Sequence, residues 1–149
     1  MSKIIFVCTG NTCRSPMAAV LAASMLQNAG INASVVSAGV GAWGGEPAST
    51  NAILVMKAEG LDLDTHRSQP TTRELLESAK LVLTMTRGHL THVSGMCPTA
   101  KVFTLGEYAG CGSDIADPFG GNEEHYRACS VQIKTLLESC IAKLREDLI

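Results

Sequence analysis

A cysteine, a glycine and an arginine stand close together near the N-terminus, in the run Cys-Thr-Gly-Asn-Thr-Cys-Arg-Ser-Pro at residues 8–16. Five residues between Cys8 and Arg14 are enough for the backbone to curl around an anion with its N–H groups pointing inward. Such a cup favours the thiolate form of Cys8, a nucleophile, and Arg14 can bind two oxygens of a tetrahedral oxyanion. The spacing therefore predicts a phosphate loop beside a reactive sulfur. Its predicted phosphate-binding residues are Thr9, Gly10, Asn11, Thr12, Cys13 and Arg14.

Two other interpretations of this segment explain less. Taken singly, Cys8 and Cys13 would be small buried apolar residues and Arg14 a solvated charge. That view does not account for the order of strand, thiol, glycine, arginine, serine and proline. A nucleotide-binding P-loop is excluded, because no Gly-Lys-Ser/Thr follows Gly10.

The residues on either side predict the elements that position this loop. Residues 3–7 are a β-branched and apolar run, typical of a strand buried on both faces of a parallel sheet. Cys8 then lies at the carboxyl end of a strand, where open α/β sheets bind ligands. Ser15 and Pro16 predict the N-cap and first turn of a helix that ends before Gly30.

The remaining pattern alternates strands with helices. Strands are predicted at 33–37, 81–85 and 102–105, helices at 50–59, 72–78 and 123–148, and a helical turn at 87–93. We expect one domain over residues 1–149 with a three-layer α/β/α fold. Its four-stranded parallel sheet has the order 2-1-3-4, with the phosphate loop between the first strand and the first helix. The apolar stripe of the last helix makes Cys129 and Cys140 core residues.

A long connection at residues 106–121 is rich in Gly and Asp, and such connections in compact domains are usually functional. Asp117 is its candidate catalytic residue, and Pro118 stiffens the backbone beside it. An Asp-Pro pair alone would be an ordinary turn, but beside Cys8 and Arg14 it is the leading candidate for the general acid. Asp117 would protonate the leaving group and then, once ionised, activate the water that hydrolyses a phosphocysteine.

This combination resembles the low-molecular-weight protein tyrosine phosphatase family, over essentially the whole chain. The family carries Cys, five residues, Arg and Ser near the N-terminus, and an Asp-Pro pair near residue 120. The resemblance implies that Ser15 donates a hydrogen bond to the Cys8 sulfur, and that Ser37 and His66 brace the phosphate loop together with Asn11. It thus implies the catalytic residues Cys8, Arg14 and Asp117 and the supporting residues Ser15, Ser37 and His66.

Three positions bear on substrate choice: Thr12, Trp43 and Phe119. Tyrosine-specific members of the family usually have a bulky aliphatic residue in place of Thr12, and tyrosines after the Asp-Pro pair, where this chain has Phe119. Both departures are similar to the protein-arginine-phosphatase branch, which shares the run at residues 7–17. The resemblance also implies that Trp43 walls the substrate slot, although packing on the base of its own loop is equally open.

The sequence thus predicts a protein phosphatase that hydrolyses phosphoarginine through a phosphocysteine intermediate, with protein tyrosine phosphatase as the alternative. A thioredoxin-coupled arsenate reductase is less favoured, because it needs two further cysteines close together after the third strand. Residues 82–89 contain none, and Cys97 and Cys111 lie fourteen positions apart. A silent phosphoprotein-binding module would have no use for both Cys8 and Asp117.

The composition and net charge of the chain limit its possible partners, cofactors and cellular location. The net charge of -2 provides no basic field for nucleic acid, and no apolar run is long enough for a signal peptide or a membrane span. We expect a cytoplasmic monomer that acts on phosphorylated proteins, with no nucleic-acid or membrane partner. The six cysteines lack metal-ligand spacing, so we expect free thiols and neither metal nor cofactor. Cys13 is predicted to form a reversible disulfide with Cys8 that protects it from overoxidation.

Overall fold

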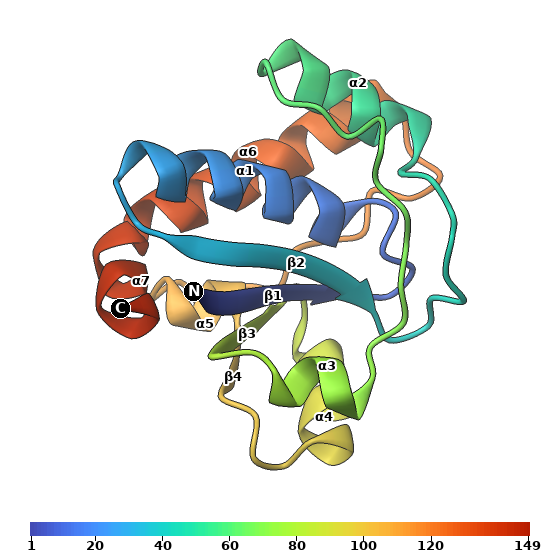
Figure 1. Ribbon diagram of the computed structural model, residues 1–149. Helices are drawn as coiled ribbons and strands as arrows, with labels where there is room; N and C mark the ends of the chain where they lie inside the picture. Colours follow the sequence, from blue (N-terminus) through green and yellow to red (C-terminus); the bar gives the residue numbers. More distant parts are fainter.

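The computed structural model describes all 149 residues and is built around a four-stranded parallel sheet (Figure 1). The strands β1 (Ser2–Cys8), β2 (Ala33–Gly39), β3 (Leu81–Thr84) and β4 (Val102–Thr104) lie in the order β2-β1-β3-β4. β1 is paired on both sides, which matches its continuous apolar sequence. The predicted sheet, its order and its parallel pairing are confirmed.

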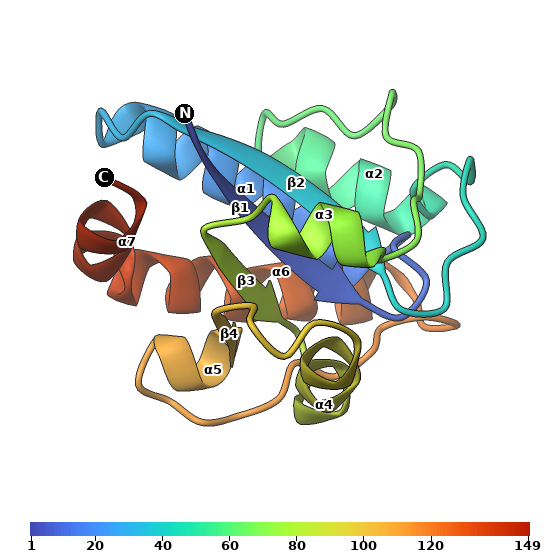
Figure 2. The same cartoon turned by 60° about the horizontal axis from the view of Figure 1, so that its bottom comes forward.

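Helices cover both faces of this sheet, as Figures 1 and 2 show. On one face lie α1 (Arg14–Asn28), α2 (Thr50–Ala58) and α6 (Glu123–Ser139), and on the other lie the shorter α3 (Arg73–Glu77) and α4 (Arg87–Met96). Because successive strand side chains point to opposite faces, Ile4 and Phe6 join the larger core, whereas Ile5 and Val7 join the smaller one. The three-layer prediction is confirmed.

The predicted last helix is wrong as one continuous element. α6 ends at Ser139, and α7 (Ile141–Leu148) begins after Cys140, whose φ of -112° and ψ of 11° interrupt the helix. The bend brings α7 against β1 and buries Leu144 and Leu148. Cys129 and Cys140 are buried as predicted, and burial raises their pKa values to about 12 and about 11, so both stay thiols.

Three smaller differences concern element ends. α1 begins at Arg14 with Cys13 as its N-cap residue, so the prediction that Ser15 caps this helix is wrong. The helical turn predicted at 87–93 is the longer α4. The connection predicted at 106–121 begins with a short helix, α5 (Leu105–Tyr108), which leaves residues 109–122 as the segment here named the acid loop.

No helix is both long enough and apolar enough to cross a bilayer.

Candidate active site

The phosphate loop, residues 8–15, leaves the carboxyl end of β1 and leads directly into α1. It forms the floor of a cavity of about 280 Å³, to which the segments after β2 and before α6 also contribute. Cys8 lies on that floor and is only 2% exposed. The cavity is lined by Cys8, Thr9, Gly10, Thr12, Cys13, Arg14, Gly41, Ala42, Glu46, Asp117 and Phe119.

The backbone of the phosphate loop leaves its donors free. The N–H groups of residues 9–13 donate no hydrogen bond to any protein atom, and the N–H of Arg14 belongs to the first turn of α1. Unpaired backbone donors at a helix N-terminus are an anion-binding arrangement, strengthened by the helix dipole. The predicted anion cup therefore has the donor groups that it needs.

Asn11 holds this loop in shape from beneath. It is fully buried, and its φ of 58° is a left-handed conformation that asparagine tolerates better than most residues. Its Nδ2 donates to Ser15 Oγ at 2.8 Å and to Ser37 Oγ at 2.9 Å, and its Oδ1 accepts from the Gln69 backbone N–H at 2.9 Å. The loop curvature is thus set by side-chain bonds to β2 and to the segment before α3.

His66 completes the brace that the family resemblance implied. Its Nε2 lies 2.7 Å from the backbone oxygen of Asn11, and since a carbonyl only accepts, this nitrogen carries the proton. Burial lowers the pKa of His66, partly offset by this hydrogen bond and reinforced by the nearby charge of Arg67. The histidine therefore acts as a neutral donor at neutral pH.

The end of β2 supports the loop from the side. Val40 and Gly41 donate backbone hydrogen bonds to the carbonyls of Cys8 and Thr9, both at 2.9 Å. Gly39 lies so close that a Cβ there would come within 2.4 Å of the Thr9 carbonyl oxygen. Only glycine fits at this position without displacing the first residues of the phosphate loop.

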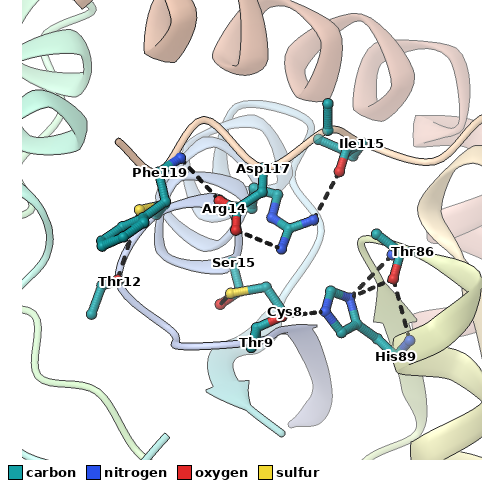
Figure 3. A network of polar contacts seen from close by, with 12 residues as sticks. Cys8, Thr9, Thr12, Arg14, Ser15, Thr86, His89, Ile115, Asp117 and Phe119 are labelled. Carbon is teal, nitrogen blue, oxygen red and sulfur yellow. Dashed lines mark hydrogen bonds and ion pairs between the residues drawn. The ribbon is translucent and has the colours of Figure 1, made fainter. Parts of the chain in front are cut away.

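Ser15 is placed to hydrogen-bond the Cys8 sulfur. Its Oγ lies 2.9 Å from Cys8 Sγ and accepts the N–H of Asn11, while its own hydrogen can be donated to the sulfur or to the Ala38 carbonyl, which lies 3.4 Å away (Figure 3). A hydrogen bond to sulfur stabilises negative charge on it. Ser15 thus lies inside α1 and not at its N-cap, at a distance from Cys8 that its predicted supporting role needs.

Arg14 connects the phosphate loop to the acid loop. Its side chain is buried, with Nη1 donating to the Ile115 carbonyl at 2.9 Å and Nη2 lying 3.6 Å from Asp117 Oδ2 (Figure 3). The Asp117 side chain is half exposed, and its Oδ1 accepts the Phe119 backbone N–H at 3.0 Å. The carboxyl group therefore stands over the cup, oriented by a turn of its own loop.

His89 is a site residue that the sequence analysis missed. Its Nε2 lies 2.8 Å from Thr9 Oγ1, while its Nδ1 accepts the Thr86 backbone N–H at 3.2 Å, which places the ring proton on Nε2 (Figure 3). Burial, assisted by the charge of Arg14, lowers the pKa of His89 to about 4. The available signal was Thr-x-x-His after the third strand, a capping box with His in the place of Glu or Gln.

The six cysteines are all free thiols. Cys13 Sγ lies 3.3 Å from the Tyr126 hydroxyl and 3.5 Å from Ser49 Oγ. The reversible disulfide between Cys13 and Cys8 stays a prediction. Neither Cys97 nor Cys111 lines the cavity. No three His, Cys, Asp or Glu side chains are arranged to hold a metal ion.

The geometry agrees with what comparison with known proteins finds. The family model described as low molecular weight phosphotyrosine protein phosphatase matches residues 3–148. The chain belongs to this phosphatase family. It is a cysteine-dependent phosphatase, and the positions of the Cys8 thiol, the free backbone N–H groups and Arg14 agree with that activity.

Similar members of the family come from several bacteria. Enzymes named protein-arginine-phosphatase from Geobacillus stearothermophilus and Bacillus subtilis are 44% and 42% identical to this chain. Each alignment covers 97% of this chain and 97% of the relative. The structure of a YwlE arginine phosphatase mutant with a phosphorylated active-site serine superposes with a TM-score of 0.93 at 41% identity, covering 97% of both chains. A low molecular weight protein-tyrosine-phosphatase, PtpB of Staphylococcus haemolyticus, is 38% identical and covers 97% of this chain and 99% of its own.

The phosphatase cavity contains two of the three predicted specificity residues. Thr12 and Phe119 line it, and Phe119 is 74% exposed at its edge. Trp43 is 92% exposed, does not line the cavity and does not pack on its own loop, so its role as a pocket wall stays a prediction. Glu46 also lines the cavity, and no local sequence pattern pointed to it.

Proposed function

We propose that this phosphatase hydrolyses phosphoarginine residues in proteins through a phosphocysteine formed on Cys8. The observation that carries the proposal is the set of unbonded N–H groups at residues 9–13, around a cavity with Cys8 on its floor and Arg14 in its wall. Two relatives named protein-arginine-phosphatase, at 44% and 42% identity, support phosphoarginine as the substrate.

In the first step the Cys8 thiolate attacks phosphorus, and the P–N bond breaks with its electron pair remaining on nitrogen. Asp117 in its protonated form donates a proton to that nitrogen, so that arginine leaves as a guanidinium. The loop N–H groups and Arg14 stabilise the equatorial phosphoryl oxygens. Arg14 is already held in place by Ile115, so little reorganisation is needed.

In the second step Asp117, now ionised, removes a proton from water, and the water oxygen attacks the phosphocysteine. The P–S bond breaks, its electron pair returns to sulfur, and inorganic phosphate is released. The Ser15 hydroxyl, 2.9 Å from the sulfur, stabilises the departing thiolate. His66, Asn11 and Ser37 keep the cup in shape through both steps.

Phosphotyrosine is the second candidate substrate, because the aromatic Phe119 lines the cavity and a 38% identical relative is named a tyrosine phosphatase. The deciding experiment compares kcat/KM on peptides that differ only in phosphoarginine or phosphotyrosine. We expect the phosphoarginine peptide to have the larger value. A larger value for phosphotyrosine overturns the assignment.

A substitution at Thr12 tests the choice between phosphoarginine and phosphotyrosine by changing the enzyme instead of the substrate. Its small polar side chain lines the cavity, and isoleucine there would present an apolar wall that suits a phenyl ring. We expect Thr12→Ile to raise the phosphotyrosine to phosphoarginine ratio of kcat/KM by about tenfold, the value of one well-placed apolar contact. An unchanged ratio removes Thr12 from the specificity argument.

The proposed chemistry also bears on the domain organisation, the cellular location and the partners of the protein. We propose that residues 1–149 work as one phosphatase domain, as a monomer in the cytoplasm, where reducing conditions keep Cys8 reduced and able to react. The match of the family model to residues 3–148 supports the single domain, and the six free thiols support the reducing compartment. Its partners are then phosphorylated proteins.

A further inference from the structure

Glu46 places a carboxylate in the cavity that the proposed mechanism does not use. It comes from the segment after β2, whereas Asp117 comes from the acid loop, so two different parts of the chain contribute acidic side chains to one site. Arg14 is the only other charged residue that lines the cavity. Apart from the general acid, Glu46 is thus the one negative group available to a bound substrate.

The backbone holds Glu46 firmly beside the phosphate loop. Its N–H donates to Ser68 Oγ at 3.0 Å, and its carbonyl accepts the Ser68 N–H at 2.7 Å. Ser68 is buried, and the next residue, Gln69, donates to Asn11 in the phosphate loop. The exposed Glu46 carboxylate itself forms no ion pair. Its position is therefore set, while its charge stays free for a ligand.

The chemistry of phosphoarginine supplies a need for that charge. The substrate carries a guanidinium group directly beside the phosphoryl group, and Arg14 adds a second positive charge to the cavity. Asp117 cannot balance the guanidinium while it holds the proton for the leaving nitrogen, because a protonated carboxyl group is neutral. A second carboxylate that stays ionised resolves this conflict.

We propose that Glu46 is a specificity-determining residue whose carboxylate binds the guanidinium of phosphoarginine while Asp117 holds the catalytic proton. This role rests on the proposed function and deepens it. A phenyl ring carries no charge, so phosphotyrosine gains nothing from Glu46. The contribution is electrostatic and partly exposed to solvent, and it is therefore expected to weaken as salt is added.

The test measures Glu46→Gln on free phosphoarginine, on a phosphoarginine peptide and on p-nitrophenyl phosphate, at low salt and at about 1 M salt. We expect kcat/KM to fall about tenfold on both phosphoarginine substrates at low salt. The loss should lie mainly in KM and shrink in high salt, with p-nitrophenyl phosphate unaffected. Glu46→Asp keeps the charge and should recover part of the loss. Glu138→Gln, an exposed residue of α6 outside the cavity, is the matched control.

Three results would overturn this role. One is an unchanged kcat/KM on phosphoarginine, and another is an equal fall on p-nitrophenyl phosphate. A fall on the peptide without one on free phosphoarginine would mean that Glu46 contacts a neighbouring peptide residue instead. Failure of the proposed function is separately visible, because the wild-type enzyme itself would then prefer the phosphotyrosine peptide.

Discussion

The phosphate loop and the acid loop meet over one cavity but are held in different ways. The phosphate loop is largely buried, and the hydrogen bonds of Asn11 tie it to Ser37 in β2 and to His66 and Gln69 in the segment before α3. The acid loop is anchored just before Asp117, at Asp114, which accepts from Arg87, and at Ile115, which donates to the Met85 carbonyl and accepts from Arg14. Two residues later Asp117 is half exposed.

This difference teaches which half of the site is preorganised. Stabilising a phosphoryl group requires donors fixed before the substrate arrives, because reorganising them would cost free energy at the moment of reaction. Delivering a proton to a protein substrate requires an acid that incoming peptide can reach. The buried half is therefore expected to affect both stability and activity, and the exposed half activity alone.

The largest expected effect is at the nucleophile. Cys8→Ser replaces the sulfur by a hydroxyl, which is a much weaker nucleophile, so kcat should fall by at least about a thousandfold. Rates on a phosphoarginine peptide measure this, with phosphate affinity as the control, since the loop donors remain. Retention of more than a few per cent of activity would refute covalent catalysis by Cys8.

The next effect concerns the exposed half. Asp117→Asn removes the transferable proton and is expected to lower kcat by about a hundredfold to ten-thousandfold. Because Asp117 is half exposed and its ion pair with Arg14 is long, the free energy of unfolding should change by less than about 0.5 kcal/mol. Urea denaturation beside kinetics tests both parts. A large loss of stability would break the contrast between the two loops.

A third prediction addresses the buried half. Asn11→Ala leaves the Ser37 hydroxyl and the Gln69 N–H without their partner, removes one hydrogen bond from Ser15 and puts alanine at a positive φ. The free energy of unfolding should therefore fall by about 3 kcal/mol. Asn11→Gly also loses the side chain but accepts the backbone angle, and should recover about 1 kcal/mol of it. Equal unfolding curves for both variants would contradict the role assigned to the backbone angle.

The smallest predicted effect is the pH dependence of stability that comes from His89. Its pKa is about 4 in the folded protein against 6.5 for an ordinary histidine, so at low pH the unfolded chain binds a proton that the folded protein does not. The stability is complete above about pH 6.5 and is lost as the pH falls toward 4. Between pH 7 and pH 5 the loss attributable to His89 is about 2 kcal/mol.

His89→Gln tests this directly, because glutamine can keep the capping box with Thr86 but does not titrate. Its free energy of unfolding should depend less on pH between 7 and 5 than that of the wild type. The same exchange at His125, which caps α6 in the same way, controls for the change of capping residue. An identical pH dependence in wild type and His89→Gln would show that His89 is not held neutral.

Patterns within short stretches of the chain were predicted well. The apolar run of β1, the Cys-x₅-Arg spacing and the alternation of strands and helices each depend on residues close together in sequence. The sheet order that was predicted, with β1 between β2 and β3, is also the observed one. The break at Cys140 was not predictable, because the helical period continues through it, and what bends the chain is the packing of α7 on β1.

The sequence by itself determined which residues are the candidates for nucleophile, phosphate-binding arginine and general acid, because that prediction depends on residue types at local spacing. Tertiary structure alone decided that His89 contacts Thr9 and that Glu46, not Trp43, reaches the cavity. Thr9 and His89 lie 80 positions apart, and they meet only because β1 and β3 are neighbours in the sheet. Contacts of this kind depend on how whole elements pack, which no local pattern of side chains specifies.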